Sequence, residues 1–121
     1  MGEFNFRNLI VYQKAISYVN HVYDLVAKFP KEEQYAICDQ LRRVAVSVPS
    51  NIAEGMNRGS VKEQLHFLNV SYSSLMETLC QFEISLNRNF INEQDWNELE
   101  SEITELSKLL GGLTKSLTSK L

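Results

Sequence analysis

Apolar side chains recur along the chain in four separate segments, at alternating steps of three and four residues. Side chains at this spacing share one face of a helix, so each segment predicts a helix with a single apolar seam. No segment of comparable length alternates residue by residue, as a half-buried strand would. We therefore expect an all-α protein. The predicted seams are Leu9, Tyr12, Ile16, Val19, Tyr23 and Val26; Cys38, Leu41, Ala45, Val48, Ile52 and Met56; Val61, Leu65, Leu68, Tyr72, Leu75, Leu79, Phe82 and Leu86; and Trp96, Leu99, Ile103, Leu106, Leu110, Leu113 and Leu117.

Helix-breaking and helix-capping residues separate the four segments. Pro30 follows the first segment, Gly59 closes the second, and Ser60 with Glu63 forms the pattern of a capping box. Asn92 is a favourable N-cap for the last segment. These signals predict helices at about 6–28, 31–57, 60–88 and 93–118. Because the connections are short, we expect one domain over 1–121, folded as an antiparallel up-down-up-down four-helix bundle.

Pro49 stands inside the second segment without disturbing its apolar spacing. Its nitrogen cannot donate a hydrogen bond to the Ala45 carbonyl, and its ring crowds that carbonyl. A loop at this point would shift the register of the apolar positions, and no shift occurs. We predict one continuous helix that is kinked at Pro49, with the hydroxyls of Ser47 and Ser50 bonding to the carbonyls that the bend frees.

Composition and charge narrow the class of protein. The chain has 121 residues, a net charge of −3 and two cysteines. No apolar run approaches the roughly 18 residues that a membrane span needs, and no signal peptide is present, so we expect a cytoplasmic protein without a membrane partner. Cys38 and Cys80 lie on or beside apolar seams at no metal-binding spacing, which favours two reduced, buried thiols.

The sequence contains few candidates for catalytic or metal-binding residues. Dinuclear metal sites in four-helix bundles need a Glu-x-x-His pair on two helices, and this chain has one such pair, Glu63 and His66. Glu63 is already assigned to a helix cap, and His21 has no glutamate three positions earlier. Neither histidine has a positional link to a serine or cysteine nucleophile. The sequence therefore predicts no catalytic residue, no metal and no cofactor.

A polar stripe on the second predicted helix is the candidate functional face. Its members recur at helical spacing beside the apolar seam, and three are arginines. With Lys62 these arginines make the main basic grouping, which is too small to predict nucleic-acid binding from charge alone. The acids gather instead between 91 and 110. The candidate assembly or RNA-binding face consists of Gln40, Arg42, Arg43, Ser47, Asn51, Glu54 and Arg58.

More apolar side chains are present than four seams require. They lie at the start of the chain and on the flanks of the third predicted helix. Wide apolar faces on a small bundle predict burial against another subunit, so we expect self-association. These additional positions are Phe4, Phe6, Val11, Phe67, Val70 and Met76.

Three stretches carry a resemblance to a known family: "FRNLIVYQKAISYVNHVYDLVAKFP", "QLRRVAVSVPSNIAEGMNRGS" and "FLNVSYSSLMETLCQF". They resemble the four-helix bundle proteins encoded in intervening sequences of bacterial 23S ribosomal RNA genes, which also carry a ribosomal-protein label. That family is similar to the accessory variability proteins of diversity-generating retroelements. The resemblance implies a homopentamer, with structured RNA or a nucleic-acid-associated protein as partner. Its most specific positions are Gln40, Arg42, Arg43, Ser47, 49–55, Arg58, Ser74 and Glu77.

Three hypotheses of function follow from the residues and the resemblance. The first is a non-enzymatic, homo-oligomeric bundle that acts as a scaffold or as a binding module for structured RNA or an RNA-associated protein. The second is a passenger protein of a mobile intervening sequence, with no fixed biochemical role. The third is a small enzyme whose polar cluster consists of Arg43, Asn51, Glu54 and Arg58.

Overall fold

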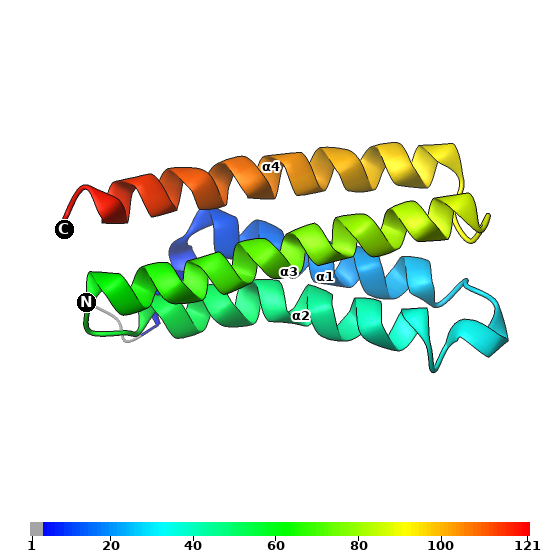
Figure 1. The fold of residues 1–121 in the computed structure, drawn as a ribbon, viewed down its shortest axis with the longest axis horizontal. Coiled ribbons are helices and arrows are strands. Elements are labelled where there is room, and N and C mark those ends of the chain that lie inside the picture. Colours follow the sequence, from blue (N-terminus) through cyan, green and yellow to red (C-terminus); the bar gives the residue numbers. More distant parts are fainter. Residues whose placement is uncertain (1–3) are drawn as a thin grey trace.

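The computed structural model describes residues 4–121, and within that range the protein is all-α. Four long helices and two short 3-10 helices make up the fold, which confirms the predicted class. The long helices form a bundle in which successive connections alternate between its two ends (Figure 1). The elements are η1 (Asn5–Asn8), α1 (Ile10–Val26), η2 (Lys31–Glu33), α2 (Ile37–Met56), α3 (Val61–Asn87) and α4 (Glu93–Thr118).

Each helix packs against two others, in the order α1, α2, α3, α4 and back to α1. The packing between α2 and α3 is the most extensive, and the packing between α1 and α4 is the thinnest. Gly55 explains the close α2–α3 approach, because a Cβ atom there would lie 2.9 Å from the Phe67 Cβ and 3.3 Å from the Gln64 carbonyl oxygen. Only a glycine lets the two backbones come so near.

The predicted boundaries hold at α3 and α4 and fail at the start of α1 and α2. Asn92 and Asp95 form a full capping box for α4. At the start of α3, the Ser60 hydroxyl accepts a hydrogen bond from the Glu63 backbone amide. The first helix starts at Ile10 and not near residue 6, because 5–8 form the separate 3-10 helix η1. The second starts at Ile37 and not at residue 31.

The late start of α2 follows from how the α1–α2 connection is held. Residues 31–33 form η2, and Gln34 then turns its side-chain amide back to the Val26 carbonyl, 2.9 Å away, at the end of α1. This carbonyl is one of those that a helix end leaves without an intrahelical partner. The Phe29 backbone amide bonds to the same carbonyl at 3.1 Å, so the Gln34 contact is a second bond, and it holds in a turn the chain that the sequence pattern had assigned to the helix.

The core confirms the predicted seams of α2 and α4, corrects that of α1, and corrects that of α3 at Tyr72, which is 41% exposed. On α1 the fully buried stripe runs through Ala15, Tyr18 and Val22, about one residue out of phase with the prediction. Ile16 and Tyr23, which were assigned to the seam, are 39% and 44% exposed. The apolar arc of α1 spans roughly half of the helix circumference, so its spacing alone did not determine which edge faces inward.

The core face of α3 contains polar side chains that the apolar pattern did not reveal. Ser71, Thr78 and Ser85 recur every seven residues and are completely buried. Ser71 and Ser85 donate to the carbonyls of Val48 and Gln81, each at 2.8 Å. Hydroxyls that bond to nearby carbonyls can be buried at low cost, and their small size helps α3 to approach α2.

The helix α2 continues through Pro49 without a break, as predicted. The kink itself stays a prediction. Ser47 does not act on a freed carbonyl, since its hydroxyl lies 2.8 Å from the Ser74 hydroxyl of α3. Ser50 is exposed. The expected burial of both cysteines is right for Cys38 and wrong for Cys80, which is exposed on α3.

A polar seam, an apolar groove and an ionic seam

Part of the predicted polar face lies along the outer edge of the α2–α3 contact. We call this part the polar seam, and it consists of Gln40, Ser47, Asn51, Glu54 and Arg58. At its centre the Ser47 and Ser74 hydroxyls are bonded at 2.8 Å. The Asn51 side-chain amide donates to the carbonyl and the hydroxyl of Ser47, at 2.8 and 2.9 Å. The Ser47–Ser74 bond ties α2 to α3, and with the two Asn51 bonds within α2 it leaves little of Ser47 or Asn51 available to a ligand.

Gln40 marks one end of the polar seam. Its side-chain oxygen accepts from the Gln81 amide nitrogen of α3 at 3.2 Å, and the same nitrogen also lies 3.3 Å from a Glu77 oxygen. Gln81 is 8% exposed, and its own side-chain oxygen is buried without a partner. This end therefore joins the two helices through the side-chain amides of Gln40 and Gln81, and the Glu77 carboxylate contacts Gln81 within α3.

Arg58 marks the other end. Its guanidinium lies 2.7 Å from a Glu54 oxygen and stacks on the Phe67 ring, 4.7 Å from the centroid. Stacking of this kind is typical of arginine, whose planar group is weakly hydrated. The backbone carbonyl of Arg58 accepts a hydrogen bond from the Gln64 side chain at 3.1 Å, which stabilises the turn between α2 and α3. Arg58 thus packs against α3.

The remaining arginines of the candidate face point elsewhere. Arg42 donates to the backbone carbonyl of Gln34 at 2.9 Å and to its side-chain oxygen at 3.3 Å, so it supports the α1–α2 connection. Arg43 pairs with Asp39 at 3.0 Å, and its side chain is 78% exposed. The basic grouping read from the sequence is therefore divided among separate local contacts.

The four residues of the enzyme hypothesis show the same local pattern. Arg43 bonds to a residue one turn back on α2, Asn51 does so with Ser47, and Arg58 does so with Glu54. Each pair is an i, i+4 contact of the kind that stabilises an exposed helix face. The geometry supplies no shared cavity in which the four side chains meet a substrate.

An apolar groove lies on the outside of the contact between α1 and α2, with a volume of about 350 Å³. The α1 side of this groove is the stripe that the sequence had assigned to the core. At one end the Phe6 ring of η1 packs edge-on against Tyr12, with centroids 5.0 Å apart. The α1–α2 groove is lined by Phe6, Tyr12, Ile16, Val19, Asn20, Val46, Pro49, Ser50 and Ala53.

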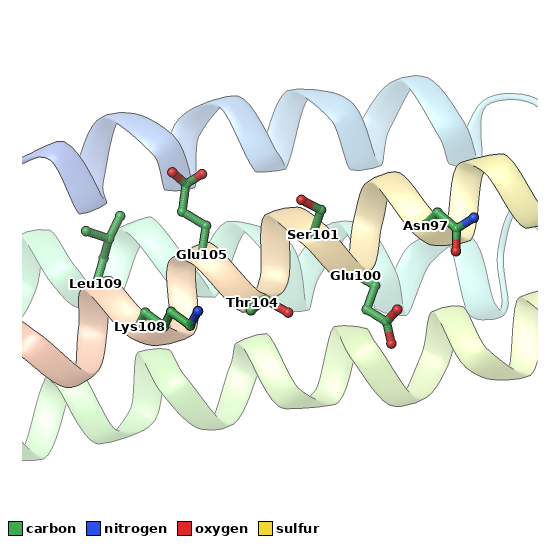
Figure 2. A pocket seen from close by; sticks show the side chains of 7 residues that line it. All are labelled: Asn97, Glu100, Ser101, Thr104, Glu105, Lys108 and Leu109. Carbon is green, nitrogen blue, oxygen red and sulfur yellow. The ribbon is translucent and has the colours of Figure 1, made fainter.

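A larger but shallower furrow of about 770 Å³ follows the outer face of α4. Figure 2 shows its seven side chains, all of which come from this one helix. Small residues such as Ser101 and Thr104 lie between longer ones, which produces the depression. A furrow with no opposing wall has no convergent groups with which to orient a small molecule.

Ionisable side chains bridge the thin contact between α1 and α4, an ionic seam that the sequence analysis missed. Lys14 pairs with Glu105 at 3.3 Å, and His21 contacts both Glu102 and, at 3.9 Å, Glu98. Burial raises the pKa of Glu102, although its hydrogen bond to His21 acts in the opposite direction. Lys14 and His21 are seven residues apart on one helix, as Glu98 and Glu105 are on another. This equal spacing of basic and acidic residues was the sequence signal that could have predicted the contact.

Neither a cluster of metal-binding side chains nor a membrane-spanning helix is found in the part of the chain that the structure describes. Within residues 4–121, no group of three or more histidine, cysteine, aspartate or glutamate side chains could hold a metal ion. None of the helices in this range combines the length and the apolar character that crossing a membrane requires.

Comparison with known protein families identifies the family of this chain. The family model described as 23S rRNA-intervening sequence protein matches residues 7–112. The chain belongs to this family. The match to the 23S rRNA-intervening sequence proteins includes α1, α2 and α3 in full and α4 as far as residue 112, and the comparisons indicate no enzyme family. No curated protein matches the chain.

A solved structure has the same fold. It is a protein of unknown function from the S23 ribosomal protein family of Bacteroides thetaiotaomicron, with a TM-score of 0.79 and 20% sequence identity. The match covers 88% of this chain and 99% of that one. At this identity the likeness shows that the two proteins share a fold.

Proposed function

We propose that this protein is a non-enzymatic, homo-oligomeric helical module that acts as a scaffold or binding module. The α1–α2 groove supports the proposal. Its lining is mostly apolar, and Ile16 and Val46 in it are each 39% exposed. Contiguous apolar surface of this kind on a small protein marks an interaction site, because each Å² removed from water contributes about 25 cal/mol.

The expected number of copies is five, which follows from the family resemblance. Light scattering coupled to size exclusion tests it. We expect a mass of about 70 kDa, five times the 13.9 kDa of one chain. A mass of one chain at micromolar concentration contradicts the proposal and favours the passenger hypothesis, which requires no assembly.

An RNA partner is the further part of the proposal. Arg43 supports it, since its side chain is 78% exposed on α2. We expect structured RNA to bind at low salt and to dissociate as salt rises, because phosphate contacts release counterions. Arg43→Ala should weaken binding in fluorescence anisotropy, whereas Arg88→Ala, which is exposed on a different helix at the C-terminal end of α3, should not.

Two outcomes contradict an RNA role at this face. One is an unchanged anisotropy with structured RNA even at low salt. The other is equal weakening by Arg43→Ala and Arg88→Ala, which would indicate a general effect of charge. Arg42→Ala is a poor test, because it also removes the contacts that Arg42 makes with Gln34 in the α1–α2 connection.

A further inference from the structure

We propose that the α1–α2 groove of one copy receives the Tyr72 flank of α3 from the next copy, in a head-to-tail contact. This contact presupposes the self-association proposed above and adds which two surfaces meet. The groove is concave and apolar, and Tyr72 is a large side chain that is 41% exposed. An aromatic anchor in an apolar pocket is the usual centre of a protein interface.

Two hydrogen bonds fix the height of Tyr72, that is, its position along the long axis of the bundle. The Ser71 hydroxyl donates to the Val48 carbonyl at 2.8 Å, and the Ser74 hydroxyl lies 2.8 Å from that of Ser47. The segment 71–74 of α3 therefore lies beside 47–48 of α2. Tyr72 is at the same height as Pro49, which lies in the middle of the groove lining on α2.

The direction of Tyr72 follows from helix geometry. Successive side chains on an α-helix are about 100° apart, and Ser71 and Ser74 both face α2. Tyr72 falls on the opposite flank of α3, toward α4. Within one chain, Tyr72 and the α1–α2 groove are thus on different sides of the bundle and cannot meet.

Rotational symmetry brings these two surfaces together in a ring. Where the ring axis runs along the bundle, each subunit is rotated about the axis without a shift in height. Tyr72 of one subunit then meets the next subunit at the height of Pro49 and Val46. The two surfaces differ, so the contact is heterologous, which is the kind that closes rings of more than two subunits.

Charge supports the same pairing. Arg43 precedes Val46 and Ser50 by about one and two turns on α2, which places it beside the groove. On the other surface, Figure 2 shows Glu100 on the side of α4 that faces α3. Opposite charges beside an apolar contact favour the correct partner and register.

Cross-linking between single cysteines tests the contact. Val46→Cys and Tyr72→Cys are each introduced in a Cys80→Ser chain, where the remaining Cys38 is fully buried. A short bis-maleimide should join the two variants when they are mixed as reassembled oligomers, and should produce chain ladders when both cysteines are on one chain. Neither variant should cross-link to itself. The matched control is Ile84→Cys, which is 47% exposed on α3 and should not link to Val46→Cys.

A second measurement uses folded charge variants. Val46→Glu and Tyr72→Glu should each reduce the oligomer to single chains while retaining the helical circular dichroism. Their mixture should restore one intact contact and give dimers. This complementation requires two different surfaces, because a contact between two identical surfaces would not be restored by mixing.

Different results would contradict the proposed self-association and the head-to-tail contact. A single-chain mass for the unmodified protein removes the proposed function and this contact with it. An oligomeric mass without cross-links between Val46→Cys and Tyr72→Cys overturns only the head-to-tail contact. So does self-linking of either variant, which indicates a symmetric interface, or linking of Val46→Cys with Ile84→Cys.

Discussion

The phenol oxygen of Tyr18 in α1 lies 2.8 Å from the Thr78 hydroxyl in α3, and both side chains are completely buried. Thr78 donates its proton to the Leu75 carbonyl at 2.6 Å, so Tyr18 is the donor between them. The bond crosses the core between helices that are diagonal in the bundle. It fixes the rotation of α1, whose apolar arc is wide enough to pack in more than one orientation.

Removing either partner of this bond should lower stability by different amounts. Thr78→Val leaves a buried phenol without an acceptor, which costs about 1–3 kcal/mol. Tyr18→Phe leaves Thr78 still bonded to Leu75, so we expect a loss of about 1 kcal/mol. Urea unfolding of both single variants and the double variant checks this. Additive effects would show that the two hydroxyls are not coupled.

Burial also makes the Tyr18 bond sensitive to alkaline pH. It raises the pKa of Tyr18 well above the usual 10. The folded state therefore holds a proton that the unfolded state releases, and stability is complete below about pH 10 and falls above it. Denaturant unfolding at pH 8 and pH 11 measures the fall. Tyr18→Phe should reduce it, and the same reduction in the exposed control Tyr35→Phe would contradict the assignment.

Gly55→Ala should destabilise the protein although alanine is the better helix former. The new methyl group would lie 2.9 Å from the Phe67 Cβ, and overpacking of this kind costs about 1–3 kcal/mol. Gly111→Ala is the matched control, because nothing lies within 4 Å of its Cβ position. There we expect a gain of up to about 1 kcal/mol from helix propensity. Equal thermal shifts for the two variants would refute the close approach of α2 and α3.

Glu102→Gln should stabilise the protein at neutral pH. Since burial raises the pKa of Glu102, its contribution is fully present below the unfolded value of about 4.3 and is lost as pH rises through the folded value. Glutamine stays neutral and keeps an oxygen that can accept from His21. The gain should appear at pH 7 and vanish near pH 3. Glu100→Gln, exposed on the same helix, should show no such pH dependence.

Pro49→Ala should raise the stability of the single chain and weaken the oligomer. Restoring the hydrogen bond to the Ala45 carbonyl recovers about 3 kcal/mol, of which the lost ring contacts cancel roughly half. We expect a more stable chain with a weaker oligomer, because Pro49 lines the groove. Calorimetry and light scattering measure the two effects. A variant that is more stable and equally oligomeric would show that this proline has no part in the contact.

Helix number, helix class and the continuity of α2 through Pro49 followed from the spacing of apolar residues and from local capping. These are short-range properties, and so are the i, i+4 pairs such as Glu54 with Arg58. The start of α1 was wrong because residues 5–8 form the separate 3-10 helix η1. The start of α2 was wrong because Gln34 reaches back to Val26 across eight positions. No local pattern encodes such a contact.

The sequence by itself determined that four amphipathic helices would form and which face of α2 and of α4 would be buried, because each of those faces has one narrow apolar seam. The tertiary structure decided the orientation of α1 and the place of the polar stripe. An apolar arc of roughly half a circumference has two usable edges. Only the Tyr18–Thr78 bond and the neighbouring helices select the edge that packs inward, and the other edge is left as the α1–α2 groove.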